Sequence, residues 1–165
     1  MNKKRVTALC WVLISGLLPL TGFADGVVTG NPDHAAMLQS KDPKLAANKR
    51  LVYDFWREVV EAGHLDLTAK YTTEGYIQHN PNYASGRQNL IDMFAKNGRK
   101  PIPIEARVKK PIVAITAEGD MVTIAFVREV PDPNDAARTY TTTNLTLFRV
   151  ENGKLAEHWD PSLKR

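Results

Sequence analysis

Apolar positions follow a helical spacing in the first half of the chain and an alternating spacing in the second. Apolar residues between 43 and 62 recur at intervals of three and four, which predicts an amphipathic helix. Asp42 suits the cap at its start, and Gly63 marks its end. From residue 102 onward apolar and polar residues alternate, as in strands with one buried face. Helices followed by an antiparallel meander predict an α+β fold.

Shorter patterns set the expected bounds of the other elements. A second amphipathic helix begins at Ser85 and ends at Gly98. The polar residues 131–138 predict a loop, and the pair Asn152–Gly153 predicts a tight hairpin. We expect strands over residues 75–80, 106–117, 121–130, 140–150 and 155–160. Together these elements predict one domain without internal repeats.

The first 24 residues have a composition of their own. Three basic residues at 3–5 precede an apolar run, and the small residues Gly22 and Ala24 suit a signal-peptidase site. An uncleaved membrane anchor is the alternative, but the run of about 15 residues is shorter than the ~20 that a spanning helix needs. We therefore predict a signal peptide over 1–24, cleaved near Ala24. The mature protein is then secreted or periplasmic and has no stable membrane anchor.

Removal of this segment changes the charge and the cysteine content. The whole chain has 22 basic and 18 acidic residues, a net charge of +4, and one cysteine, Cys10. Residues 1–24 include Cys10 and three of the basic residues, so the remainder is nearly neutral. A nearly neutral domain gives no reason to expect nucleic-acid partners. Without Cys10 it can form neither a disulfide nor a thiol nucleophile.

Residues 25–42 differ from the domain that follows them. They are mostly small and polar, with Gly, Pro and Asn at turn positions. We expect a flexible N-terminal arm here, with a short helix over 34–39. The folded domain is then expected over residues 43–165.

Two strand ends carry the candidate catalytic groups. In the expected strand 155–160, His158 and Asp160 share one face, while Glu157 and Trp159 share the other. A histidine beside a carboxylate suits general acid–base chemistry near neutral pH. The simpler interpretation is that Asp160 caps the strand end and that His158 is an ordinary surface residue.

The expected strand 75–80 contains a second histidine, His79. Tyr76 and Gln78 share one strand face, whereas Ile77 and His79 share the other. Tyr76 and His79 therefore face the same side only if a bulge intervenes. Ligand spacings typical of metal sites and glycine-rich nucleotide motifs are absent from the sequence, so we expect neither a metal nor a cofactor.

Three segments together resemble a known family: NKRLVYDFWREVVEAG, YIQHNP with the following GRQNLIDMF, and FRVENGKLAEHWD. They are similar to SnoaL-like polyketide cyclases of the nuclear transport factor 2-like superfamily, over about residues 44–163. The resemblance implies a cone-shaped, curved antiparallel sheet wrapped around the long N-terminal helix, with an internal cavity. It also implies a homodimer.

Enzymes of this family transfer a proton next to a carbonyl group without a metal or organic cofactor. By resemblance, Asp160 corresponds to the family's carboxylate and His79 to its pocket histidine, with His158 a further candidate. Under this hypothesis Asp160 removes an α-proton and His79 donates a hydrogen bond to the enolate oxygen. The implied partner is a small hydrophobic carbonyl-containing molecule.

Further residues are expected to bind this ligand. Tyr76, Gln78 and Asn80 are candidate polar helpers, and Tyr53 and Trp56 are the candidate apolar wall. Two other functions stay open, because one fold serves many functions. The first is a non-catalytic periplasmic protein that binds a small molecule. The second is an assembly module that dimerises through its outer sheet face.

Overall fold

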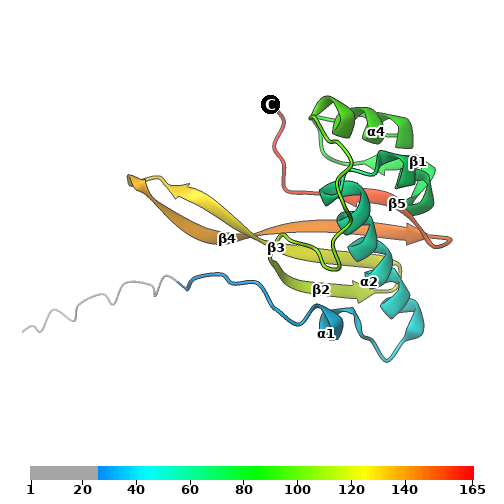
Figure 1. The fold of residues 1–165 in the computed structure, drawn as a ribbon, viewed down its shortest axis with the longest axis horizontal. Helices are drawn as coiled ribbons and strands as arrows, with labels where there is room; N and C mark the ends of the chain where they lie inside the picture. Colours follow the sequence, from blue (N-terminus) through cyan, green and yellow to red (C-terminus); the bar gives the residue numbers. More distant parts are fainter. Residues whose placement is uncertain (1–25) are drawn as a thin grey trace, which may run out of the picture.

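This computed structural model describes residues 26–165 of the chain. They form a curled five-stranded sheet with helices packed against its inner face (Figure 1). The expected signal peptide of residues 1–24 lies outside the described residues. The strands, in the spatial order β1-β5-β4-β3-β2, are β1 (Thr72–Gln78), β2 (Ile112–Glu118), β3 (Met121–Asp132), β4 (Asp135–Glu151) and β5 (Lys154–Trp159). The helices are α1 (His34–Leu38), α2 (Pro43–Phe55), α3 (Thr68–Tyr71) and α4 (Arg87–Lys96). The predicted α+β class is confirmed.

The long helix begins where the sequence predicts and changes character near its end. Asp42 Oδ1 accepts a hydrogen bond from Lys44 N at 2.8 Å and so caps α2. After Phe55 the chain continues as a π-helical turn, Trp56–Glu61. Such turns are rare and recur at functional sites. The pattern over 43–62 predicts one uniform helix and does not reveal this change.

The first and last strands lie side by side, although they are far apart in sequence. β1 runs parallel to β5, and Gln78 pairs with His158 across a sequence separation of 80 residues. The other neighbouring strands are antiparallel, as the meander predicts. The β1–β5 pairing brings the two candidate strand ends together.

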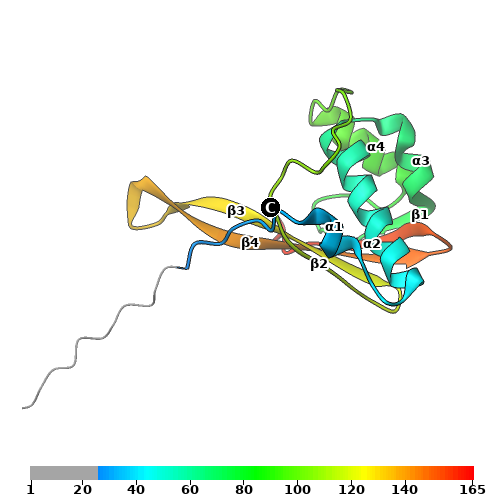
Figure 2. The same ribbon diagram turned by 60° about the horizontal axis from the view of Figure 1, so that its bottom comes forward.

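The hairpin of β3 and β4 extends well past the helices (Figure 2). β3 continues to Asp132 and β4 begins at Asp135, so the predicted loop over 131–138 is wrong. The outer part of this hairpin is largely exposed, so its strands need no alternation of apolar and polar residues. The polar composition that predicts a loop therefore also fits solvated strands.

β2 starts later than the sequence predicts. The alternation suggests a strand from residue 106, but β2 begins at Ile112. The backbone N–H groups of Lys109 and Lys110 donate to the two oxygens of Glu61 at 2.8 and 2.9 Å. These bonds hold the preceding segment against the π-helical turn instead of the sheet.

The segment before α2 packs against the rest of the domain. α1 forms within the predicted range 34–39 and buries Met37 and Leu38. Asn31 N donates to a backbone carbonyl of β2 at 2.7 Å. Part of the expected arm over 25–42 is therefore packed against the domain, because the two apolar side chains of α1 reach the core.

The core lies between α2 with its π-helical turn and the inner face of the sheet. Val52 and Val59 contribute from the helical side, and Ile124, Phe126 and Phe148 from the strands. Aromatic rings fill much of this space, and Phe55 meets Phe148 edge to face at 6.1 Å between ring centroids. None of the helices within residues 26–165 is long and apolar enough to cross a membrane.

Candidate functional site

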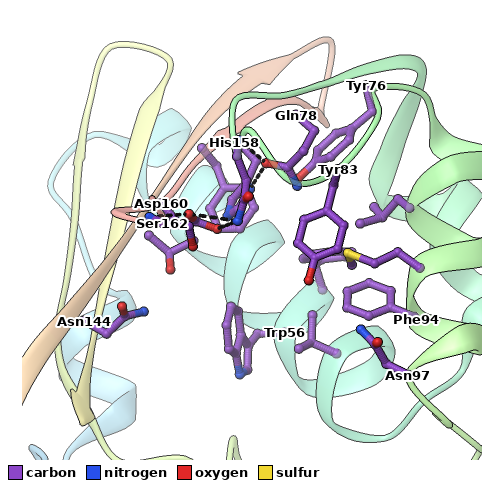
Figure 3. A pocket seen from close by; sticks show the side chains of 17 residues that line it. Trp56, Tyr76, Gln78, Tyr83, Phe94, Asn97, Asn144, His158, Asp160 and Ser162 are labelled. Atoms are coloured by element: carbon purple, nitrogen blue, oxygen red, sulfur yellow. Dashed lines mark hydrogen bonds between the residues drawn. The ribbon is translucent and has the colours of Figure 1, made fainter. Parts of the chain in front are cut away.

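A cavity of about 300 Å³ lies between the helices and the inner face of the sheet (Figure 3). Its apolar side comes from the end of α2, the π-helical turn and α4, and includes Phe55, Trp56, Val60, Leu90, Met93 and Phe94. Its polar side comes from β1, β5 and the residues that follow them: Tyr76, Gln78, Asn80, His158 and Asp160. A cavity that combines an apolar side with convergent polar groups is suited to bind a small molecule.

Strand alternation places the polar side chains. Gln78 and His158 are register partners in the β1–β5 pair, and both line the cavity. Tyr76 precedes Gln78 by two residues and Asp160 follows His158 by two, so they reach the same side. The faces shared by these two pairs are those that the alternation predicts.

The side-chain amide of Gln78 is held in one orientation. Its Oε1 accepts the backbone N–H of Asn80 at 3.0 Å, which identifies this atom as the oxygen. His158 Nδ1 lies 2.7 Å from the same oxygen and therefore carries the imidazole hydrogen. Within residues 26–165, His158 Nε2 then keeps a free lone pair and Gln78 Nε2 keeps two free hydrogens.

Asp160 is held as a carboxylate by three hydrogen bonds from two donor groups. Asn80 Nδ2 donates to Oδ1 and Oδ2 at 3.1 and 2.9 Å, and Ser162 N donates to Oδ1 at 2.9 Å. Burial works to raise the pKa of Asp160, but the hydrogen bonds from Asn80 and Ser162 hold it below its ordinary value. Asp160 is therefore ionised at neutral pH, and its position is fixed.

The two neighbouring groups are both uncharged at neutral pH. Burial lowers the pKa of His158 to about 4, although the charge of Asp160 opposes this shift. Burial and the charge of Asp160 both raise the pKa of Tyr76, so it stays a phenol. Tyr76 is 2% exposed, and its hydroxyl forms no hydrogen bond with another residue in the described chain. It is a donor available to a ligand.

Two predicted site residues lie elsewhere. His79 is on the outer face of the sheet, where Nε2 lies 2.8 Å from Glu157 Oε2 and the ring stacks on Trp159 at 4.4 Å. The register irregularity of β1 lies between Thr72 and Ile77, and Ile77 and Gln78 then pair regularly with β5. Tyr76 and Gln78 both line the cavity, so alternation holds His79 away from it. Tyr53 is almost fully buried beside α1 and does not line this cavity. Trp56 does line it.

The cavity also contains residues that the sequence analysis did not single out: Tyr83, Asn97, Asn144, Thr146 and Ser162. The alternation of the fourth strand could have found Asn144 and Thr146, because they share a face with Phe148. Tyr83 and Ser162 lie in irregular segments, where no period predicts which side chains turn inward.

Metal ligands do not gather at this site. Within residues 26–165, no three His, Cys, Asp or Glu side chains lie close enough to hold a metal ion. His79 and His158 lie on opposite faces of the sheet, so they cannot share an ion with Asp160.

The low pKa of His158 predicts how stability depends on pH. The pKa of His158 falls from 6.5 to about 4 on folding. Its contribution to the free energy of unfolding is therefore fully present above pH 6.5 and is lost as the pH falls toward 4. A shift of this size is worth roughly 3 kcal/mol. His34 shifts in the same direction and adds to the effect.

The substitution His158→Asn separates the contribution of His158 from that of His34. Asparagine Nδ2 can replace the imidazole Nδ1 as donor to Gln78, but it does not titrate. In urea unfolding between pH 7 and about 4, we expect the variant to lose less stability than the wild type. The same pH dependence in both proteins would contradict the assignment.

The curled sheet, the long helix against its inner face and the cavity between them define the nuclear transport factor 2-like fold. A family model described as a SnoaL-like domain matches residues 52–158, and the chain belongs to this family. The family and the fold, two of the features that the sequence resemblance implies, are confirmed.

Two solved structures illustrate the likeness. A polyketide cyclase candidate from Acidithiobacillus ferrooxidans is 18% identical, with 74% of this chain and 89% of that chain covered and a TM-score of 0.50. A SnoaL-like polyketide cyclase candidate from Jannaschia sp. CCS1 is also 18% identical, with 74% and 91% covered and a TM-score of 0.50. Likeness at this level of identity shows the fold alone. No curated protein matches the chain in sequence.

Proposed function

We propose that the cavity binds a small hydrophobic molecule with a carbonyl group, and that the exported, dimeric protein transfers a proton next to that carbonyl without a cofactor. One observation carries the proposal. An ionised carboxylate on Asp160 and free donors on Tyr76 and Gln78 line a single cavity with apolar walls. A positioned base and donors for the developing oxyanion are the two things that enolisation requires.

In the proposed reaction, Asp160 accepts a proton from the carbon next to the carbonyl. The electron pair of that C–H bond forms a C=C bond, and the carbonyl oxygen gains the negative charge. The hydroxyl of Tyr76 and the Nε2–H of Gln78 donate hydrogen bonds to this oxygen. The proton then returns to another carbon in an isomerisation or to a departing hydroxyl in a dehydration, or the enolate attacks a second carbonyl in an aldol cyclisation.

In this proposal Tyr76 and Gln78, and not His79, donate the hydrogen bonds to the enolate oxygen. His79 lies on the outer face, whereas Gln78 is fixed by its bonds from Asn80 and His158 with its donors unused. His158 is a positioning residue in this proposal. Because it stays neutral, its Nδ1–H holds the Gln78 oxygen without adding a charge beside Asp160.

The binding function is a second candidate, and one observation favours it. The pKa of Asp160 is lowered by its hydrogen bonds, and a weaker base removes a proton from carbon more slowly. The same apolar cavity and donors would then hold a carbonyl compound without changing it.

Exchange of α-hydrogens distinguishes the two functions without knowledge of the natural ligand. The purified protein is incubated in D2O with a panel of alicyclic and aromatic ketones, and deuterium uptake is followed by mass spectrometry. We expect uptake faster than in buffer for those ketones that bind. Binding with no acceleration would support the binder and contradict the proton-transfer proposal.

The substitution Tyr76→Phe tests the oxyanion donors. Loss of one such donor costs about 10²-fold in rate in other enzymes, and we expect a slowing of that order with ketone affinity little changed. Tyr140→Phe is the matched control, because Tyr140 is 49% exposed on β4 and does not line this cavity. Equal exchange rates in the wild type and both variants would remove Tyr76 from the mechanism.

A further inference from the structure

A second cavity lies between α1, α2 and the segment before β2. Its volume is about 280 Å³, and it shares no lining residue with the first cavity. Most of its lining precedes residue 52, where the match to the family model begins. It is built largely by the segment that the sequence analysis expected to be a flexible arm, and it contains Tyr53.

Two arginines with unused donors line this cavity. Within residues 26–165, neither Arg50 nor Arg107 forms an ion pair with a carboxylate. Arg107 Nη1 makes only a long hydrogen bond of 3.4 Å to Pro32 O. The Arg50 guanidinium lies 5.8 Å from the centre of the Tyr53 ring. Each guanidinium carries five N–H donors, so most of these hydrogens are available.

A chain of hydrogen bonds gives the cavity a third donor. Val108 N donates to the Tyr53 hydroxyl at 3.0 Å, and His34 Nδ1 lies 2.8 Å from the same hydroxyl. Among the described residues only His34 can accept the buried phenol hydrogen, so Nδ1 is the acceptor and Nε2 carries the imidazole hydrogen. Burial and then Arg107 lower the pKa of His34, which keeps the imidazole neutral in this tautomer.

The lining carries a positive balance. Asp33 is its acidic member, and Asp33 Oδ1 is already used to cap α1 by accepting from Ala36 N at 2.9 Å. Two guanidinium charges therefore face one carboxylate. Most of the polar groups in the cavity that have no hydrogen-bond partner among the described residues are N–H donors. Such donors are the groups that bind an oxyanion.

We propose that this second cavity binds the oxyanion group of a small ligand, a phosphate or a carboxylate, with Arg50, Arg107 and His34 as donors. The planar forks of the two arginines can each hold two oxygens, and His34 Nε2–H can hold a third. The site is independent of the proton-transfer proposal, because its residues are separate from the first cavity.

Titration with simple anions tests this proposal. Inorganic phosphate and benzoate are added separately to the full protein at constant ionic strength set with sodium chloride, and backbone amide shifts are followed by NMR. We expect saturable shifts in residues 33–38 and 106–108. Saturation by phosphate alone assigns the site to phosphate groups, and saturation by benzoate alone assigns it to carboxylates. Absence of saturation with both anions overturns the proposal.

Charge-neutral variants identify the donors. We expect Arg50→Gln and Arg107→Gln each to weaken anion binding about tenfold or more, the usual effect of losing a charge-assisted hydrogen bond. Arg50→Lys keeps the charge but loses the fork, so its affinity should fall between those of the wild type and Arg50→Gln. Arg99→Gln is the control, because Arg99 is exposed and lines neither cavity. Wild-type affinity in both glutamine variants would overturn the proposal.

Discussion

Replacing Asp160 with asparagine is expected to slow α-deuterium exchange about 10²- to 10⁴-fold, the usual contribution of a positioned general base. The amide has nearly the shape of the carboxylate but cannot accept the proton. Ketone binding should persist, because the apolar side of the cavity and the donors on Tyr76 and Gln78 are unchanged. Exchange rates by mass spectrometry and ketone affinities by calorimetry are measured on the same samples.

Glu157→Gln is the matched control for this substitution. Glu157 lies three residues before Asp160 on the outer face, where it accepts from Arg149 Nε at 2.6 Å and contacts His79. The change removes the same charge from nearly the same place in the chain, but on the other side of the sheet. We expect wild-type exchange in this variant. Wild-type exchange in Asp160→Asn would instead rule out Asp160 as the base.

Phe126→Ala is expected to be the most destabilising of the substitutions considered, by about 3–5 kcal/mol. Phe126 is fully buried on β3, its ring centroid lies 4.2 Å from that of Trp56, and the Lys110 ammonium lies 4.7 Å from its centre. The substitution leaves a hole behind one wall of the cavity, since Trp56 rests on this ring. The midpoint of urea unfolding should fall with little change in slope.

Tyr140→Ala provides the comparison for this loss of stability. It removes another aromatic ring from the same sheet, but from an exposed position on the projecting hairpin. Exposed substitutions usually change stability by about 0.5 kcal/mol or less. A similar loss in both variants would mean that ring removal in general, and not the packing of Phe126 against Trp56, accounts for the effect.

Alternation along two short strands predicted the polar side of the cavity better than family resemblance did. The period of two put His158 with Asp160 and Tyr76 with Gln78, and both pairs line the cavity. The resemblance placed His79 in the pocket against this period, and the structure places it on the outer face. The register irregularity of β1 lies before Ile77, so the regular pairing that follows it fixes which face His79 occupies.

Other parts of the structure depend on contacts that no local pattern contains. Tyr53 and Trp56 lie three residues apart, but only Trp56 reaches the cavity, because Tyr53 turns toward α1, where its hydroxyl lies 2.8 Å from His34 Nδ1. The projecting hairpin is polar where the sequence predicts a loop. Its strands are stabilised by mutual backbone pairing, such as Val130 with Tyr140, and not by burial of one face.

The pairing of Gln78 with His158 has a consequence for when the site can form during folding. The two residues are separated by 80 positions, so their contact closes a loop that spans half of the chain. Such long-range strand pairing is slow compared with the formation of helices. As the chain folds, α2 and α4 can form well before β5 pairs with β1. Until that last strand docks, the Gln78 amide has no imidazole donor and Asp160 has no fixed position. The proposed proton transfer can therefore begin only when folding of the domain is complete.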